Sequence, residues 1–156
     1  MNLVAELARV RSRLGDYTGA LDLWQRVLVD ATGADDVARV ASVERSIGLA
    51  RYWSGAFEDA LAHYDAAIAA ARAAHDRTLE ARILIAKASA LQATGKTVES
   101  SAEIELALSI ATELGDAGLL ARAHRAMLLL YVWTGPAEKA RKHGAHAVEF
   151  AEASGQ

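Results

Sequence analysis

Apolar residues recur along the chain every three to four positions, which is the spacing of one face of an α-helix. Near the N-terminus they fall at Leu3, Leu7, Val10 and Leu14. The following stretch continues in the same way, at Ala20, Leu21, Trp24, Val27, Leu28 and Ala31. This pattern predicts eight helices, over residues 2–14, 17–31, 36–53, 57–74, 77–93, 97–114, 117–133 and 137–153.

The chain also repeats itself with a period of 40 residues. Glycine recurs at Gly15, Gly55, Gly95 and Gly135 with no insertion or deletion between them. Other positions keep the same frame: a small residue at Ala8, Gly48 and Ala88, and a large one at Trp24, Tyr64 and Ile104. A helix pair per repeat cannot bury both of its faces alone, so we expect neighbouring pairs to stack. The small residues would let the two helices of a pair approach closely.

Each repeated glycine lies between two helix-length stretches, where a residue with positive φ ends the first helix at little cost. Gly135-Pro136 is the clearest example, with Gly beyond one helix and Pro expected in the first turn of the next. The second boundary of each repeat lies near Gly33, His75 or Gly115, each shortly before an aspartate that can cap the following helix.

Composition agrees with an all-α chain, since 53% of residues are apolar, aromatics make up 6%, and there is one Pro. The net charge of −3 does not attract nucleic acid, and the absence of Cys excludes thiol chemistry. The longest apolar run, residues 126–133, is too short to span a membrane. Charged residues occupy the place where a signal peptide would be apolar. We therefore expect a cytoplasmic protein.

The repeat resembles the tetratricopeptide repeat (TPR) family over the whole chain. The first repeat matches best, with Ala8, Gly15, Tyr17, Ala20 and Trp24 at the family's spacing. The second matches through Gly48, Gly55, Phe57, Ala60, Tyr64 and Ala67. The resemblance implies an all-α fold, a right-handed superhelical solenoid of about four helix hairpins in one domain, residues 1–156. The repeats would cover residues 1–35, 36–75, 76–115 and 116–155.

Several positions depart from the family pattern. Thr97 and Ala137 replace the aromatic after the glycine, and Gly144 replaces the large residue of the second helix. The period is 40 residues, whereas about 34 is usual for the family. Alanine-rich repeats of this length are similar to the helical arrays of large bacterial LuxR-type and antibiotic-regulator transcriptional activators. This similarity implies either a piece of such a regulator or a small free-standing relative.

Charge is divided unevenly between the two helices of each repeat. The first-helix segments hold 11 basic and 6 acidic residues, and the remaining segments hold 6 basic and 14 acidic residues. In TPR superhelices the first helices line the concave face. The resemblance therefore implies a basic, aromatic concave groove, with partner-binding residues Arg9, Arg13, Arg45, Tyr52, Trp53, Arg82, Gln92, Arg122, Arg125 and Trp133, accompanied by Leu49, Ser89 and Leu129.

No pattern in the chain predicts catalysis or a cofactor. The motifs of serine hydrolases, zinc proteases, P-loop enzymes and dinucleotide-binding enzymes are absent from the sequence. His143 and His146 are spaced to share one helical face, but a metal site needs three or four ligands. We expect a non-enzyme that needs no cofactor or metal.

These observations predict a protein-binding scaffold whose groove takes an acidic peptide or partner, because arginine binds carboxylates in a bidentate manner. Solubilising surface arginines and core-covering tryptophans are the structural alternative to such a groove. A free-standing adaptor that forms homo-oligomers through exposed terminal repeats is a second functional possibility. A binder of single-stranded nucleic acid is a third, since Arg with Trp and Tyr can follow a phosphate backbone.

Overall fold

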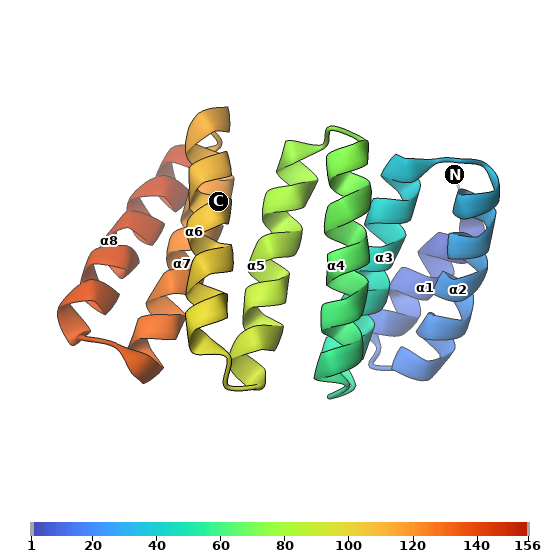
Figure 1. Ribbon diagram of the computed structural model, residues 1–156, viewed down its shortest axis with the longest axis horizontal. Helices are drawn as coiled ribbons and strands as arrows, with labels where there is room; N and C mark the ends of the chain where they lie inside the picture. The colour runs from blue at the N-terminus through green and yellow to red at the C-terminus, as the bar shows by residue number, and fades with distance from the viewer. Residues whose placement is uncertain (1, 156) are drawn as a thin grey trace. The chain divides into compact units, whose positions relative to one another are not determined.

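The computed structural model describes residues 2–155. Over this range the chain folds into eight α-helices and no strand, joined by short turns, and the two helices of each hairpin run in opposite directions (Figure 1). They are α1 (Leu3–Arg13), α2 (Tyr17–Gly33), α3 (Val37–Trp53), α4 (Phe57–Ala73), α5 (Arg77–Ala93), α6 (Thr97–Leu114), α7 (Ala117–Thr134) and α8 (Ala137–Ser154). The eight predicted helices are confirmed.

Aspartate caps begin half of the helices. The side chains of Asp16, Asp36, Asp76 and Asp116 accept hydrogen bonds from the backbone N–H three residues ahead, at 2.9, 3.0, 2.8 and 3.0 Å. Each bond satisfies an N–H of the first turn that has no partner within its helix. The predicted capping is confirmed for Asp76 and Asp116, whereas the cap of α3 is Asp36 and not the expected Asp35.

The glycines at the first boundary of each repeat do not all behave alike. Gly15, Gly55 and Gly95 have φ of +81°, +82° and +78°, as expected for residues that end a helix in the left-handed region. Gly135 is extended instead, with φ of −126°, and Pro136 is the residue before α8 rather than part of its first turn. Gly135 does lie beyond the end of α7, but the expected positive φ is wrong because a proline restricts the residue before it to extended backbone. The expected place of Pro136 in the first turn of α8 is also wrong.

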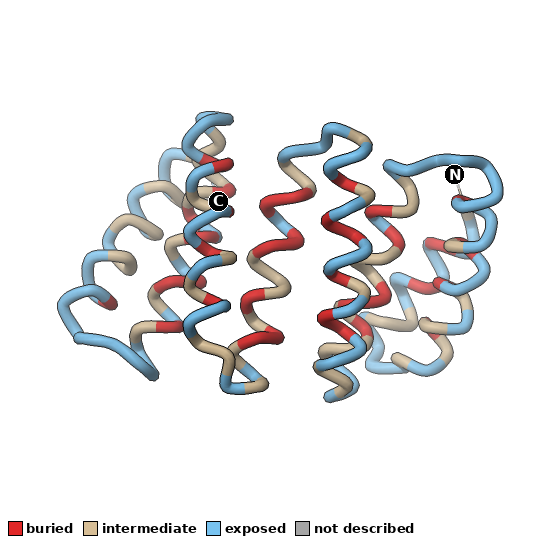
Figure 2. The backbone as a smooth tube through the Cα atoms, viewed as in Figure 1, coloured by how far each residue is buried: buried red, intermediate tan, exposed pale blue. Residues whose placement is uncertain are grey.

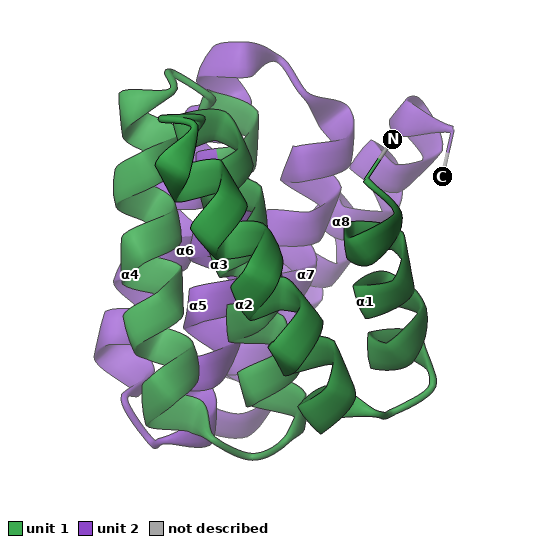
Figure 3. Cartoon of the chain, turned by 90° about the vertical axis from the view of Figure 1, so that its right-hand side faces the viewer, with its two compact units in different colours: residues 1–79 green, residues 80–156 purple. Residues whose placement is uncertain are grey.

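The chain divides into two compact units, residues Met1–Leu79 and Glu80–Gln156, coloured separately in Figure 3. In unit 1, α1, α2 and α3 share one cluster of buried side chains: Ala5, Ala8, Ala20, Trp24, Val27, Val43 and Ile47. In unit 2, the corresponding cluster joins α5, α6 and α7: Ala88, Ile104, Ala123, Ala126, Met127 and Leu130. Each unit therefore contains a place where the second helix of one repeat packs on the first helix of the next.

Candidate functional site

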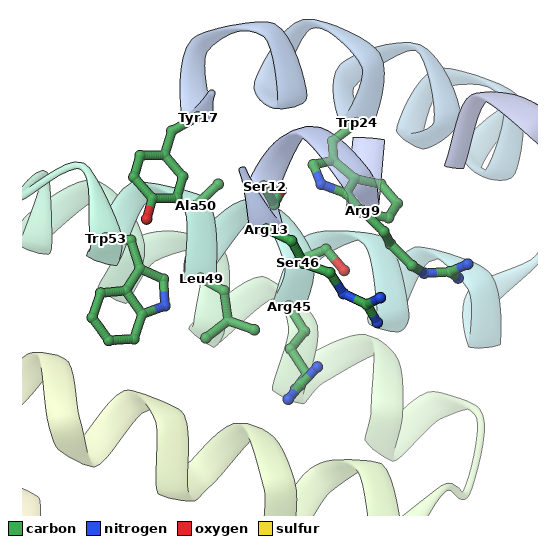
Figure 4. Close-up of a pocket in the computed structure, with 10 residues that line it drawn as sticks. All are labelled: Arg9, Ser12, Arg13, Tyr17, Trp24, Arg45, Ser46, Leu49, Ala50 and Trp53. Atoms are coloured by element: carbon green, nitrogen blue, oxygen red, sulfur yellow. The ribbon is translucent and has the colours of Figure 1, made fainter. Parts of the chain in front are cut away.

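A pocket of about 360 Å³ lies within unit 1, between α1, the start of α2, and α3 (Figure 4). We call it the Arg–Trp pocket. Its lining consists of Arg9, Ser12, Arg13, Tyr17, Trp24, Arg45, Ser46, Leu49, Ala50 and Trp53. Five of these residues belong to the predicted groove, so the structure brings together the part of that prediction that falls on α1 and α3, except Tyr52.

Helical spacing accounts for this convergence. Arg9 and Arg13 lie one turn apart on α1, and Arg45, Leu49 and Trp53 follow at intervals of four on α3. The backs of the same two helices carry Ala5, Ala8, Val43 and Ile47 into the core of unit 1. Because core packing fixes the rotation of α1 and α3 about their axes, the arginines of both helices are held on the side that faces the pocket.

The arginines of the pocket differ in what they contact. Arg9 pairs with Glu6, and its guanidinium carbon lies 5.9 Å from the centre of the Trp24 ring. Arg13 is exposed and forms no ion pair or hydrogen bond with the part of the chain that the structure describes. In Figure 4 the Arg13 and Arg45 guanidinium groups lie toward one end of the pocket, and Trp53 and Tyr17 toward the other. The pocket thus has a cationic end and an aromatic end.

Two tryptophans give the pocket its apolar surface. Trp53 is 64% exposed, and its ring contacts Tyr52 edge-on with centroids 5.1 Å apart. Trp24 is only 3% exposed, yet its indole N–H finds no hydrogen-bond acceptor among residues 2–155. A buried donor without a partner is costly, and indole N–H groups in buried positions are usually satisfied. An acceptor supplied by a bound ligand would satisfy it.

The other predicted groove residues lie elsewhere. Tyr52 packs beside Phe57, with ring centroids 5.5 Å apart, and does not line the pocket. In unit 2, the Gln92 side-chain amide donates to the buried Ser100 hydroxyl at 3.1 Å, which in turn donates to the Ala88 carbonyl at 3.0 Å. Gln92 therefore has a structural contact of its own.

The remaining arginines and the last tryptophan of the predicted set also belong to unit 2. Arg122 and Arg125 line a separate cleft of about 490 Å³ between α7 and α8. Arg82 and Trp133 are exposed and line none of the pockets described here.

Sequence reasoning missed Tyr17 and Trp24 as lining residues, together with Ser12 and Ser46. Both aromatics belong to α2, and the resemblance assigns second helices to the opposite face. Tyr17 is the first residue of α2, directly after the turn that joins it to α1. An aromatic placed two residues after a helix-ending glycine could have indicated that this turn contributes to the pocket.

Histidines form the main titratable cluster of unit 2. His124 Nδ1 lies 2.9 Å from His143 Nδ1, and the His124 ring also lies close to His146, with ring centroids 5.0 Å apart. Burial, followed by the charges of His143 and His146, lowers the pKa of His124 to about 4. Within residues 2–155 no group of three or more His, Asp or Glu side chains is arranged to hold a metal ion.

Two solved structures have a fold similar to that of this chain. A kinesin light chain protein of Podosopora anserina with nearly identical TPR-like repeats matches with a TM-score of 0.66, covering 98% of this chain and 86% of that one. A single-substitution variant of that protein matches equally well, covering 98% and 85%. The fold is a TPR-like helical repeat.

The two matches share only 15% and 14% sequence identity with this chain, so the TPR-like likeness concerns the fold alone. No family model matches the sequence, and no curated protein matches it. The all-α repeat architecture predicted from the 40-residue period is confirmed. No described helix of this TPR-like chain is long and apolar enough to cross a membrane.

Proposed function

We propose that the chain is a non-catalytic protein-binding module, and that the Arg–Trp pocket binds an acidic segment of a partner protein. The observation that carries the proposal is the meeting of Arg13 and Arg45, from two helices, with the exposed Trp53 in one pocket. Guanidinium groups bind carboxylates through paired hydrogen bonds, and aromatic side chains supply large contact areas at low entropic cost.

Trp24 adds a second, independent argument. Its side chain lines the same pocket, and its buried indole N–H lacks an acceptor among residues 2–155. Once a neighbouring side chain moves aside, a ligand carboxylate or peptide carbonyl would accept this hydrogen bond while its neighbouring atoms contact the arginines. A ligand that offers a carboxylate beside an apolar side chain therefore fits both ends of the pocket.

The test uses a short fluorescein-labelled peptide of alternating Glu and Leu with a free C-terminal carboxylate, titrated with the whole chain. We expect Arg13→Glu to weaken binding by about tenfold or more, since a lost hydrogen bond to a charged group costs about 1.5–3 kcal/mol. Trp53→Ala should have an effect of similar size, because truncating an aromatic anchor costs about 2 kcal/mol or more. Arg141→Glu is the matched control, because Arg141 is exposed but lies outside the pocket. Equal affinity for all four proteins would refute the proposal.

The same assay separates peptide binding from nucleic-acid binding. A single-stranded oligonucleotide serves as the competing probe, with both ligands measured at low and high salt. Phosphate-backbone binding weakens steeply as salt rises, because it releases condensed counterions. Preference for the oligonucleotide with such a salt dependence would replace the peptide proposal with a nucleic-acid one.

The context of the module is also a proposal. The alanine-rich 40-residue repeats favour a part of a bacterial transcriptional regulator, acting in the cytoplasm as one four-repeat domain, residues 1–156.

A further inference from the structure

Four large apolar residues of α1 are exposed, Leu3, Val4, Leu7 and Val10, and so is Leu14, which directly follows the helix. We call Leu3, Leu7 and Val10 the α1 stripe, because their spacing of four and three places them on one face of the helix. They are 72, 46 and 49% exposed. So much apolar surface on one short helix is unusual for a face that contacts only solvent.

The repeat shows what covers this stripe elsewhere. Forty residues on, Val43, Ile47 and Ala50 occupy the same positions of α3 and are at most 3% exposed. Val43 and Ile47 belong to the cluster that includes Trp24 and Val27 of α2. In unit 2, Ala123, Met127 and Leu130 hold these positions of α7 and pack in one cluster with Ile104 of α6. The covering partner is therefore the second helix of the preceding repeat.

Helix α8 is a second helix, and it exposes the surface on which the first helix of a following repeat would pack. Gly144, Ala147, Val148 and Ala151 line the cleft between α7 and α8, together with Ala121, Arg122, Arg125 and Leu128. Gly144 and Ala147 are the positions that Trp24 and Val27 occupy in α2, each 120 residues earlier. Val148 is 59% exposed, whereas its equivalent in α4, Ile68, is buried. Figure 2 shows the contrast, with α8 mostly pale blue and tan.

The volumes of the two surfaces are complementary. Gly144 stands where the earlier repeats have Trp24, Tyr64 and Ile104, so the α8 side is hollow, with a cleft of about 490 Å³. Leu3 stands where the later repeats have Val43, Ile83 and Ala123, so the α1 side carries a side chain at least as large as its equivalents. Leu129, Val132 and Trp133 of α7 are also exposed. A large side chain on α1 thus matches in size the space that Gly144 leaves on α8.

We propose that the α1 stripe of one copy of this chain docks into the α7–α8 cleft of a second copy, in the register by which α3 packs on α2 and α7 on α6. The contact is head-to-tail, because it joins two different surfaces. Each copy retains one surface after the contact forms, so assembly can proceed beyond a dimer. The proposal is independent of peptide binding, since neither the α1 stripe nor the cleft lines the Arg–Trp pocket.

Sedimentation velocity of the whole chain, from low micromolar to submillimolar concentration, tests the proposal. The unaltered protein should show a mass that rises with concentration. Leu7→Glu and Val148→Glu should each weaken self-association by at least about tenfold, since either buries an uncompensated charge in the contact. Val98→Glu is the matched control, because Val98 is 80% exposed on α6 and lies on neither surface.

Mixing the two variants gives the decisive measurement. Leu7→Glu keeps an intact cleft and Val148→Glu keeps an intact α1 stripe, so the mixture should form a one-to-one dimer and nothing larger. A monomeric unaltered protein would overturn the proposal. So would a Val148→Glu protein that associates as well as the unaltered one, because the contact would then join two like surfaces. Circular dichroism and thermal unfolding of each variant separate lost association from lost folding.

Discussion

The hairpins α3–α4 and α7–α8 share one sequence frame but fill it in opposite ways. In α3–α4 the small residue is on the first helix: a Cβ atom added to Gly48 would lie 2.6 Å from Cε1 of Tyr64. In α7–α8 the same two positions are Leu128 and Gly144, and a Cβ atom added to Gly144 would lie 3.5 Å from Cδ2 of Leu128. Large and small residues have exchanged helices between the two hairpins.

The exchange changes what each hairpin exposes. Tyr64 is 1% exposed and fills the space beside Gly48, and burial raises the pKa of its hydroxyl. Leu128 is only half-buried and does not fill the space beside Gly144, so both residues line the open α7–α8 cleft. The repeat period thus fixes where helices run, while the volumes of two side chains decide whether their surface is closed or available to a partner.

A polar pair shows the same contrast. In α3–α4, Glu44 Oε2 lies 2.6 Å from His63 Nδ1, a carboxylate–imidazole pair. Eighty residues later the two positions are His124 and His143, whose Nδ1 atoms lie 2.9 Å apart. This second contact needs one ring to donate and the other to accept, so it requires at least one neutral imidazole. Protonation of both rings would therefore break this contact.

The largest expected effect comes from Gly48→Ala. The added methyl group would collide with the Tyr64 ring, which is buried and cannot move away, so we expect a loss of about 1–3 kcal/mol in the free energy of unfolding. Urea unfolding followed by circular dichroism measures it. In a Tyr64→Leu background the same substitution should cost less, because the ring is gone. An unchanged urea midpoint for Gly48→Ala alone would show that the Tyr64 ring shifts to accommodate the methyl group at little cost.

Much of this fold could be predicted from the sequence because its signals are local and repeated. The 3–4 spacing of apolar residues defined the helices, and aspartates such as Asp76 and Asp116 marked their beginnings. The φ of Gly135 was predicted wrongly, although the proline beside it carried the necessary information. The repeat could show that Leu128 and Gly144 depart from the frame, but not that the departure leaves a cleft.

The candidate site was only partly predictable because it depends on packing between helices. Arg9, Arg13 and Arg45 followed from the resemblance, which assigns first helices to one face. Trp24 was expected only to fill the core, since its unsatisfied indole N–H becomes visible only when all its neighbours are placed. Gln92 was expected in the groove, but its bond to Ser100 depends on a buried serine where the other repeats have alanine.

The next expected effect is a pH dependence confined to the α7–α8 hairpin. The pKa of His124 is about 4 in the folded chain, below its ordinary value of 6.5. Between these values the unfolded chain binds a proton that the folded chain does not, so stability falls as the pH falls from 6.5 towards 4 and changes no further from this group below 4. His143 acts in the same direction, since burial, with His146, Lys142 and Lys139, lowers its pKa.

Thermal unfolding between pH 7.5 and pH 4 measures this dependence. His124→Gln removes the titrating ring while keeping a side chain that can hydrogen-bond to His143. We therefore expect a shallower decrease of the melting temperature below pH 6.5 in the variant than in the unaltered protein. Equal slopes for the two proteins would count against the histidine cluster as the source of acid sensitivity.

The smallest expected effect is that of Gly144→Ala, the counterpart of Gly48→Ala in the exchanged hairpin. The new methyl group would sit at an ordinary contact distance from Leu128, and alanine favours a helix interior over glycine by about 0.8–1.0 kcal/mol. We expect the free energy of unfolding to rise by up to about 1 kcal/mol, measured by urea unfolding at low protein concentration. The sign, opposite to that of Gly48→Ala, is the point of the comparison, because both substitutions add one methyl group at a helical glycine. A loss of stability as large as that of Gly48→Ala would mean that Leu128 is packed as tightly as Tyr64, and the open cleft of α7–α8 would have to be abandoned.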